Sequence, residues 1–193
     1  MGWSISWLAV KDTPPQELLA HFGLEPGGES GVAFDSPISF KACPSGWSIL
    51  ALQRFEHKFL AAEHAKALSA GHDFICCSLD DRVMVSASEG WRDGTRLWRV
   101  VHNAEEEVEE FQEVEVSGSP PAALDEILAT LRKEHEEDKE GGVDYFFDAP
   151  IRLAEALTGF AHDHAGDEET KSPVENFKFV IAPPAAKRRW FFW

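Results

Sequence analysis

The stretch that decides the fold is DFICCSLDDRVMVSASEGWRDGTRLWRVVHNAEEEVEEFQEVE, which runs from Asp73 to Glu115. It divides into runs rich in Val, Ile, Phe and Trp that are separated by short polar segments, a pattern typical of antiparallel strands joined by turns. The sharpest local signal is Asp93-Gly94, because Asp and Gly tolerate the positive φ that a tight hairpin requires. The predicted strands are residues 73–79, 83–88, 95–103 and 108–116.

The last two of these strands are expected to differ in position. Residues 108–116 carry acidic side chains on both sides, which is typical of an edge strand whose charges discourage edge-to-edge pairing. Residues 95–103 place apolar side chains on both faces, with Leu97 on one and Trp98 on the other. This strand is therefore expected nearer the centre of the sheet.

Two strand-helix units are predicted upstream of these strands. Residues 3–10 form the first predicted strand, and the helix after it is expected to start with Thr13 as its N-cap and Pro14 at its first position. Residues 46–54 form the second predicted strand, which leads into a helix near residues 59–70.

The segment between the two units, residues 24–44, contains PGGESG and further prolines and is expected to be a loop. The tetrapeptide GWSI occurs at residues 2–5 and again at residues 46–49. Four shared residues fit either a duplicated unit or a coincidence.

Two helices are predicted downstream of the strands. The first follows Ser119 as a cap and Pro120-Pro121, and the second follows Asp148 as a cap. Apolar residues recur at helical spacing in both. These residues are Leu124, Ile127, Leu128 and Leu131 in the first helix and Ile151, Leu153, Leu157 and Phe160 in the second.

Together these elements predict an α+β fold. Its mixed, largely antiparallel sheet comprises two strand-helix units followed by a meander, with the helices mainly on one face. Residues 1–164 are expected to form a single α+β domain. Residues 165–193 are expected to form a linker and an aromatic C-terminal tail, with a short strand at residues 177–181.

The segment VDYFFDAPIRLAEALTGFAHDH, residues 143–164, resembles a stretch in a family of uncharacterised bacterial proteins, as do GWRDG and LWRVVH upstream. The resemblance covers roughly residues 71–164. It implies a shared fold, and it implies no functional residues because the family has no established activity.

The net charge constrains the class of partner. The chain of 193 residues has 34 acidic and 18 basic side chains and a formal net charge of −16. This charge opposes binding to nucleic acid or to an anionic membrane, and it attracts a basic protein. The first 15 residues contain no apolar run long enough for a signal peptide or a membrane span, so a cytoplasmic location is expected. Three cysteines, two of them adjacent, favour a reducing compartment over a disulfide framework.

Two charged or aromatic segments are candidate interaction surfaces. The acidic run between residues 105 and 115 could engage a basic partner or could simply be a solvated face. Its candidate residues are Glu105, Glu106, Glu107, Glu109, Glu110, Glu113 and Glu115. The tail ends in Trp190, Phe191, Phe192 and Trp193 after three basic residues. It could dock on the acidic body or on a neighbouring subunit, giving a homo-oligomer; disorder and membrane contact are the alternatives.

Residues capable of catalysis or metal binding are few. His162, His164 and Asp167 are weak candidates for a metal site, and a polar loop is the simpler interpretation. No cofactor-binding motif is present, and none of the nucleotide-binding, hydrolase or metalloprotease motifs occurs.

Three further sets of residues carry groups capable of chemistry. His102 is either a general acid or base or the partner of a neighbouring Glu in a surface ion pair. Cys76 and Cys77 are the thiols carried on a strand, with no histidine placed by the sequence to activate them. His57 and His64 are seven residues apart and lack a third metal ligand.

The sequence therefore favours a protein that acts by protein-protein binding, for example an immunity-type inhibitor of a basic toxin or nuclease. The alternative is a small enzyme or ligand-binding protein with a pocket between the sheet and its helices, near His102 or His162. A purely structural subunit that associates through the tail is a third possibility. The absence of catalytic motifs weighs against an enzyme.

Overall fold

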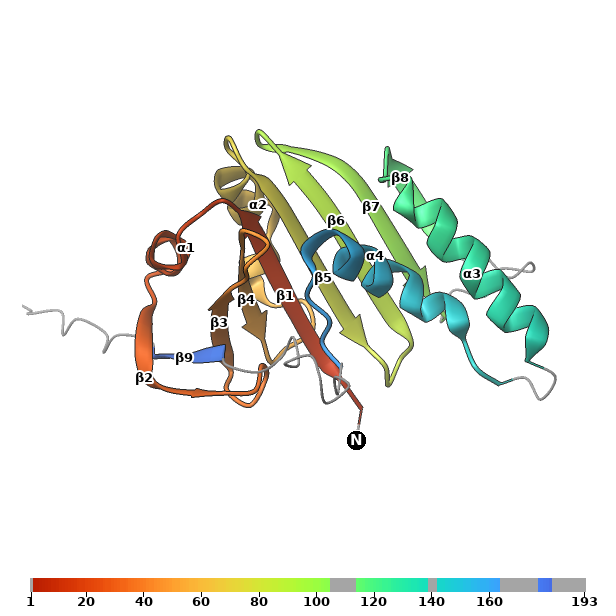
Figure 1. Ribbon diagram of the computed structural model, residues 1–193, viewed down its shortest axis with the longest axis horizontal. Coiled ribbons are helices and arrows are strands. Elements are labelled where there is room, and N and C mark those ends of the chain that lie inside the picture. Colours follow the sequence, from red (N-terminus) through yellow and green to blue (C-terminus); the bar gives the residue numbers. More distant parts are fainter. Residues whose placement is uncertain (1, 105–113, 139–141, 164–176, 182–193) are drawn as a thin grey trace, which may run out of the picture.

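The computed structural model describes residues 2–104, 114–138, 142–163 and 177–181, which form one sheet with helices on both faces (Figure 1). The strands are β1 (Ser4–Lys11), β2 (Glu25–Gly31), β3 (Ile38–Ala42), β4 (Trp47–Leu52), β5 (Asp73–Asp80), β6 (Val85–Arg92), β7 (Thr95–Asn103), β8 (Glu115–Gly118) and β9 (Phe177–Ile181). The α-helices are α1 (Pro15–His21), α2 (Ala62–Leu68), α3 (Ala123–Glu137) and α4 (Ala149–Thr158), and the 3-10 helices are η1 (Lys58–Leu60) and η2 (Tyr145–Asp148).

The strand order across the sheet is β2-β9-β3-β4-β1-β5-β6-β7-β8, and every neighbouring pair of described strands is antiparallel. The prediction of an α+β fold with a largely antiparallel sheet is confirmed. The centre is occupied by β1, whose residues from Ile5 to Val10 are all buried. As expected, β7, which contains residues 95–103, lies nearer the centre of the sheet than its neighbour β8, which is the edge strand.

The hairpin at Asp93-Gly94 is confirmed. Asp93 has φ 49° and Gly94 has φ 74°, and the pair Arg92 and Thr95 closes the turn. Two successive positive φ values define the turn whose twist matches that of the flanking strands. The turn is also fixed to the end of α2, because the Gly94 amide donates to Ser69 Oγ at 3.0 Å.

Side chains that alternate along the strands build two separate cores. Along β1, Trp7 faces the core covered by α3, η2 and α4, whereas Leu8 faces the core covered by α1, η1 and α2. Figure 1 shows α4 in front of the sheet and α2 behind it. The two longer helices, α3 and α4, share one face, as expected, whereas α1 and α2 lie on the other.

The segment predicted as a loop, residues 24–44, was wrongly assigned, since it contains β2 and β3. Most residues of β2 are exposed, and its sequence EPGGESG has low strand propensity. It forms a strand because β9 pairs with it, in register Glu25 to Ile181 and Gly31 to Phe177. The predicted strand at residues 177–181 is thus confirmed, and the sheet extends beyond the predicted domain boundary at residue 164.

The predicted helix starts differ in detail from the structure. Thr13 does not cap α1, because its hydroxyl donates to the Lys11 carbonyl at 3.3 Å and Pro14 occupies the N-cap position. The N-cap of α3 is Ala122 in place of Ser119. Asp148 does occupy the N-cap of α4, although its carboxylate accepts a hydrogen bond from Arg152 at 3.2 Å and none from the helix amides.

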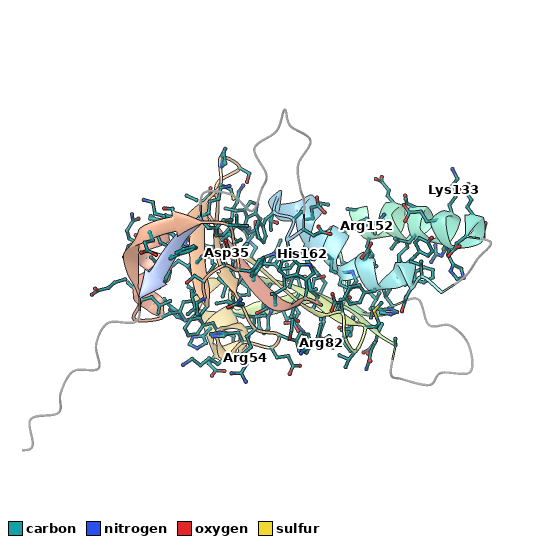
Figure 2. The ribbon with its side chains drawn as sticks, turned by 90° about the horizontal axis from the view of Figure 1, so that it is seen from below. Asp35, Arg54, Arg82, Lys133, Arg152 and His162 are labelled. Carbon is teal, nitrogen blue, oxygen red and sulfur yellow. The ribbon has the colours of Figure 1, made fainter. Side chains whose placement is uncertain are left out.

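Arg152 also donates to Glu134 at 3.1 Å and so connects α4 to α3 (Figure 2). In the part of the chain that the structure describes, no helix is long and apolar enough to cross a membrane.

Candidate functional site

A cavity of about 330 Å³ opens on the sheet face that carries α1, η1 and α2, and we refer to it as the sheet cavity. Its floor belongs to three neighbouring strands, and its wall is the segment between β4 and α2. The floor residues are Cys76, Cys77, Ser78, Val85, Ala87, Glu89, Arg99 and Val101. The wall residues are Phe55, Glu56, His57, Lys58, Leu60 and Ala61.

The register of the strands explains the hollow. Ser78 pairs with Ala87, and Ala87 pairs with Val101, so these side chains form one row across β5, β6 and β7. Residues that pair directly across antiparallel strands point to the same face. Because Ser and Ala are short, this row leaves space that no described helix covers.

A second row contains the polar groups of the floor. Cys76 pairs with Glu89, and Glu89 pairs with Arg99. Glu89 Oε1 lies 3.0 Å from Arg99 Nε and accepts a hydrogen bond from Arg96 Nη1 at 3.4 Å. Glu89 Oε2 accepts a hydrogen bond from Trp91 Nε1 at 2.9 Å. The carboxylate of Glu89 is therefore neutralised and held in place from both sides.

The wall is stiffened by His57, which is the N-cap of η1. Its Nδ1 accepts a hydrogen bond from the Phe59 amide at 3.2 Å, so the neutral ring carries its proton on Nε2. Burial lowers the pKa of His57, and the nearby charges of Lys58 and Arg54 lower it further. Figure 2 shows Arg54 on the side of the sheet away from α3 and α4.

The Cys76 side chain lies on the cavity face, whereas that of Cys77 packs in the core of the opposite face, and both thiols are protonated. Burial, together with the carboxylate of Glu89, raises the pKa of Cys76 well above its ordinary value. Burial likewise raises the pKa of Cys77. Because the thiolate is the nucleophilic form of cysteine, neither residue is prepared for nucleophilic attack at neutral pH.

His102 lies on the other face of the sheet and does not line the cavity. It is buried, and its Nε2 lies 2.7 Å from Asp144 Oδ2, a hydrogen-bonding contact with a residue 42 positions further along the chain. Its ring also packs edge-on against Phe147. His102 therefore does not lie at the surface, as the predicted ion pair required, and the neighbouring residues Glu105, Glu106 and Glu107 lie outside the described residues. No local spacing in the sequence indicates Asp144 as a partner.

His162 is also buried on that face, where its ring stacks on Trp7 with 6.0 Å between centroids (Figure 2). Its predicted companions His164 and Asp167 lie outside the described residues. Among the residues that are described, no group of three or more His, Cys, Asp or Glu side chains could hold a metal ion. His64 contacts His21 instead of His57, with 3.0 Å between the ring nitrogens.

The predicted interaction surfaces fall mainly outside the described residues. These include Glu105, Glu106, Glu107, Glu109, Glu110 and Glu113 of the acidic run, and Trp190, Phe191, Phe192 and Trp193 of the tail. Glu115 is described, and it is exposed at the start of the edge strand β8. The partner-binding role of both segments stays a prediction.

Comparison of the chain with protein-family models, with curated proteins and with solved structures finds no significant match.

Proposed function

We propose that the protein binds a small organic ligand in the sheet cavity. The observation that carries this proposal is the cavity itself, whose volume of about 330 Å³ lies at the lower end of the range for small-molecule pockets. Apolar side chains, including Val85, Ala87 and Val101, would contact the body of the ligand. Polar groups on opposite sides, Arg99 and His57, would fix its orientation.

The polar groups of the cavity favour binding over chemistry. The Cys76 thiol is protonated, Glu89 accepts two hydrogen bonds and pairs with Arg99, and Nδ1 of His57 is occupied by the Phe59 amide. None of these groups is placed with a second group that would activate it as a nucleophile or a general base. We therefore favour a binding protein over an enzyme.

A cavity-filling substitution tests the proposal. Benzamide, benzoate and benzylamine are suitable probes because they share one ring and differ in charge. At least one should shift amide resonances of residues 55–61 and of β5 to β7, and Ala87→Trp should abolish these shifts by filling the cavity. Ala129→Trp is the matched control, because Ala129 is exposed on α3.

A probe whose amide shifts lie elsewhere, or survive in a folded Ala87→Trp variant, would contradict the proposal. Ala87→Leu provides a smaller filling residue if the Trp variant does not fold. Native-like dispersion of the amide spectrum reports folding in each case.

A second candidate function rests on the net charge of −16. Such a charge attracts a basic protein, and an immunity-type inhibitor of a basic toxin or nuclease in the cytoplasm is one function of this kind. The acidic run from residue 105 to residue 115 is the proposed contact surface. A homo-oligomer through Trp190, Phe191, Phe192 and Trp193 is the related proposal for the tail, and deletion of these four residues should then change the oligomeric state.

Charge reversal tests the second candidate. Pull-downs at low and moderate salt should recover a basic protein that is lost as salt rises, because charges at an interface rim are screened. Replacing Glu105, Glu106 and Glu107 by Lys should weaken this recovery by at least tenfold. Reversal of the exposed α3 residues Glu126, Glu136 and Glu137 is the control of equal charge, and equal weakening by both variants would refute a specific surface.

A further inference from the structure

We infer that the ligand of the sheet cavity is an organic anion, a carboxylate or phosphate monoester attached to an apolar body, and that Arg99 binds its anionic group. This inference rests on the proposed ligand-binding function. It adds the chemical class of the ligand and the residue that recognises it.

The guanidinium of Arg99 is positioned and only partly engaged. Its Nε lies 3.0 Å from Glu89 Oε1, and its side chain is 36% exposed. Within the described residues, its two terminal amino groups make no hydrogen bond. Because Glu89 fixes the guanidinium in the floor, these two groups present the fork that binds a carboxylate or phosphate through two parallel hydrogen bonds.

The opposite wall also presents donors. Nδ1 of His57 accepts a hydrogen bond, which leaves the Nε2 proton to be donated. Lys58 lies next to His57 and also lines the cavity. Burial is the main cause of the lowered pKa of His57, and the positive charges of Lys58 and Arg54 lower it further. These two charges lie near the ring and favour an anion in the same space.

The acidic groups do not reverse this preference. The carboxylate of Glu89 already pairs with Arg99 and accepts hydrogen bonds from Arg96 and Trp91. Glu56 is exposed and forms part of the wall, where it opposes an anion. The remaining acidic residues act at longer range and are screened beyond about 8 Å at physiological ionic strength. The contacts inside the cavity therefore decide the sign of the charge on the preferred ligand.

Three probes of the same shape measure this preference. The dissociation constants of benzoate, benzamide and benzylamine are obtained from the shifts of the cavity amides. Benzoate should bind at least tenfold more tightly than benzamide, and benzylamine should bind most weakly. Phenyl phosphate should bind about as tightly as benzoate. This comparison distinguishes a site for anions in general from a site restricted to carboxylates.

Arg99→Met tests the assigned residue. It should weaken benzoate at least tenfold and change benzamide less than threefold, because only the charged contact is lost. Arg92→Met is the control, since Arg92 pairs with Asp73 on an exposed part of the hairpin. Glu56→Gln should strengthen benzoate by removing the opposing charge, and bound benzoate should raise the pKa of His57 in an imidazole titration.

The outcomes separate the inference from the proposed function. Equal binding of benzoate and benzamide in the cavity would overturn the inference and retain a ligand-binding site. Benzoate affinity that is unchanged in a folded Arg99→Met variant would overturn the role of Arg99. If no probe shifts the cavity amides, the proposed function fails together with the inference.

Discussion

His21 on α1 is joined to His64 on α2 by a hydrogen bond of 3.0 Å between their rings, and this pair should make stability depend on pH. Burial lowers the pKa of His21 below its ordinary value of 6.5, and the charge of His64 lowers it further. The unfolded chain therefore takes up a proton at a higher pH than the folded chain does. The stability that neutral His21 contributes is full above pH 6.5 and is lost as pH falls through the folded pKa.

We therefore expect the free energy of unfolding to fall between pH 7.5 and pH 5, and to fall less steeply in His21→Gln. Urea unfolding at several pH values measures this slope. His57 has a lowered pKa for similar reasons and should contribute in the same direction, so His57→Gln provides a comparison. An identical slope in wild type and His21→Gln would contradict the assignment.

At the scale of single residues, the sequence indicates the local structure and burial of a residue better than it indicates which distant residue it contacts. The turn at Asp93-Gly94 was predictable because its chemistry is local. The pairing of His102 with Asp144 was not, because it joins residues 42 positions apart. Cys76 and Arg99 were both within predicted strands, yet only the register of β5, β6 and β7 places them in one cavity.

At the scale of secondary structure, β9 completes the sheet by lying between β2 and β3. Phe177 is fully buried in the core under α4, where its ring lies 5.5 Å from that of Phe160. This explains why β2 could not be recognised as a strand: the strand that pairs with it is about 150 residues further along the chain.

We predict that Phe177→Ala costs about 3–5 kcal/mol of stability, the usual range for removing a buried Phe side chain. Hydrogen exchange should show that the amides of β2 lose protection first, because β2 pairs only with β9 among the described strands. Lys178→Ala on the same strand is the control, since Lys178 is exposed. Equal protection of β2 in both variants would show that β2 does not depend on β9.

At the scale of the whole molecule, the two faces of the sheet are covered unequally. The helices α3 and α4 with η2 cover the face of β5 to β7 on one side. On the other side, α1 packs against β2, β3 and β4 and α2 packs against β6, and the sheet continues beyond them with Leu97 46% exposed. The sheet cavity lies where this cover ends, which is why a hollow between sheet and wall remains.

His102 and His162, near which a pocket is expected from the sequence, are buried on the other face and do not line the sheet cavity, whereas His57 does. Hydrophobic patterning indicates which residues are apolar, but it does not tell which of two faces a short helix covers. The described residues that line the sheet cavity include none from the acidic run between residues 105 and 115. Charge reversal in the acidic run should therefore leave benzamide binding in the cavity unchanged.

The most direct test of the central claim is a measurement of intermolecular nuclear Overhauser effects between bound benzamide or benzoate and the protein methyl groups. We expect contacts from the ring protons of the probe to the methyl groups of Val85, Ala87 and Val101, and their loss in Ala87→Trp. Contacts to methyl groups of the α3 and α4 face, or no contacts at saturating probe, would contradict the claim that the sheet cavity is the binding site.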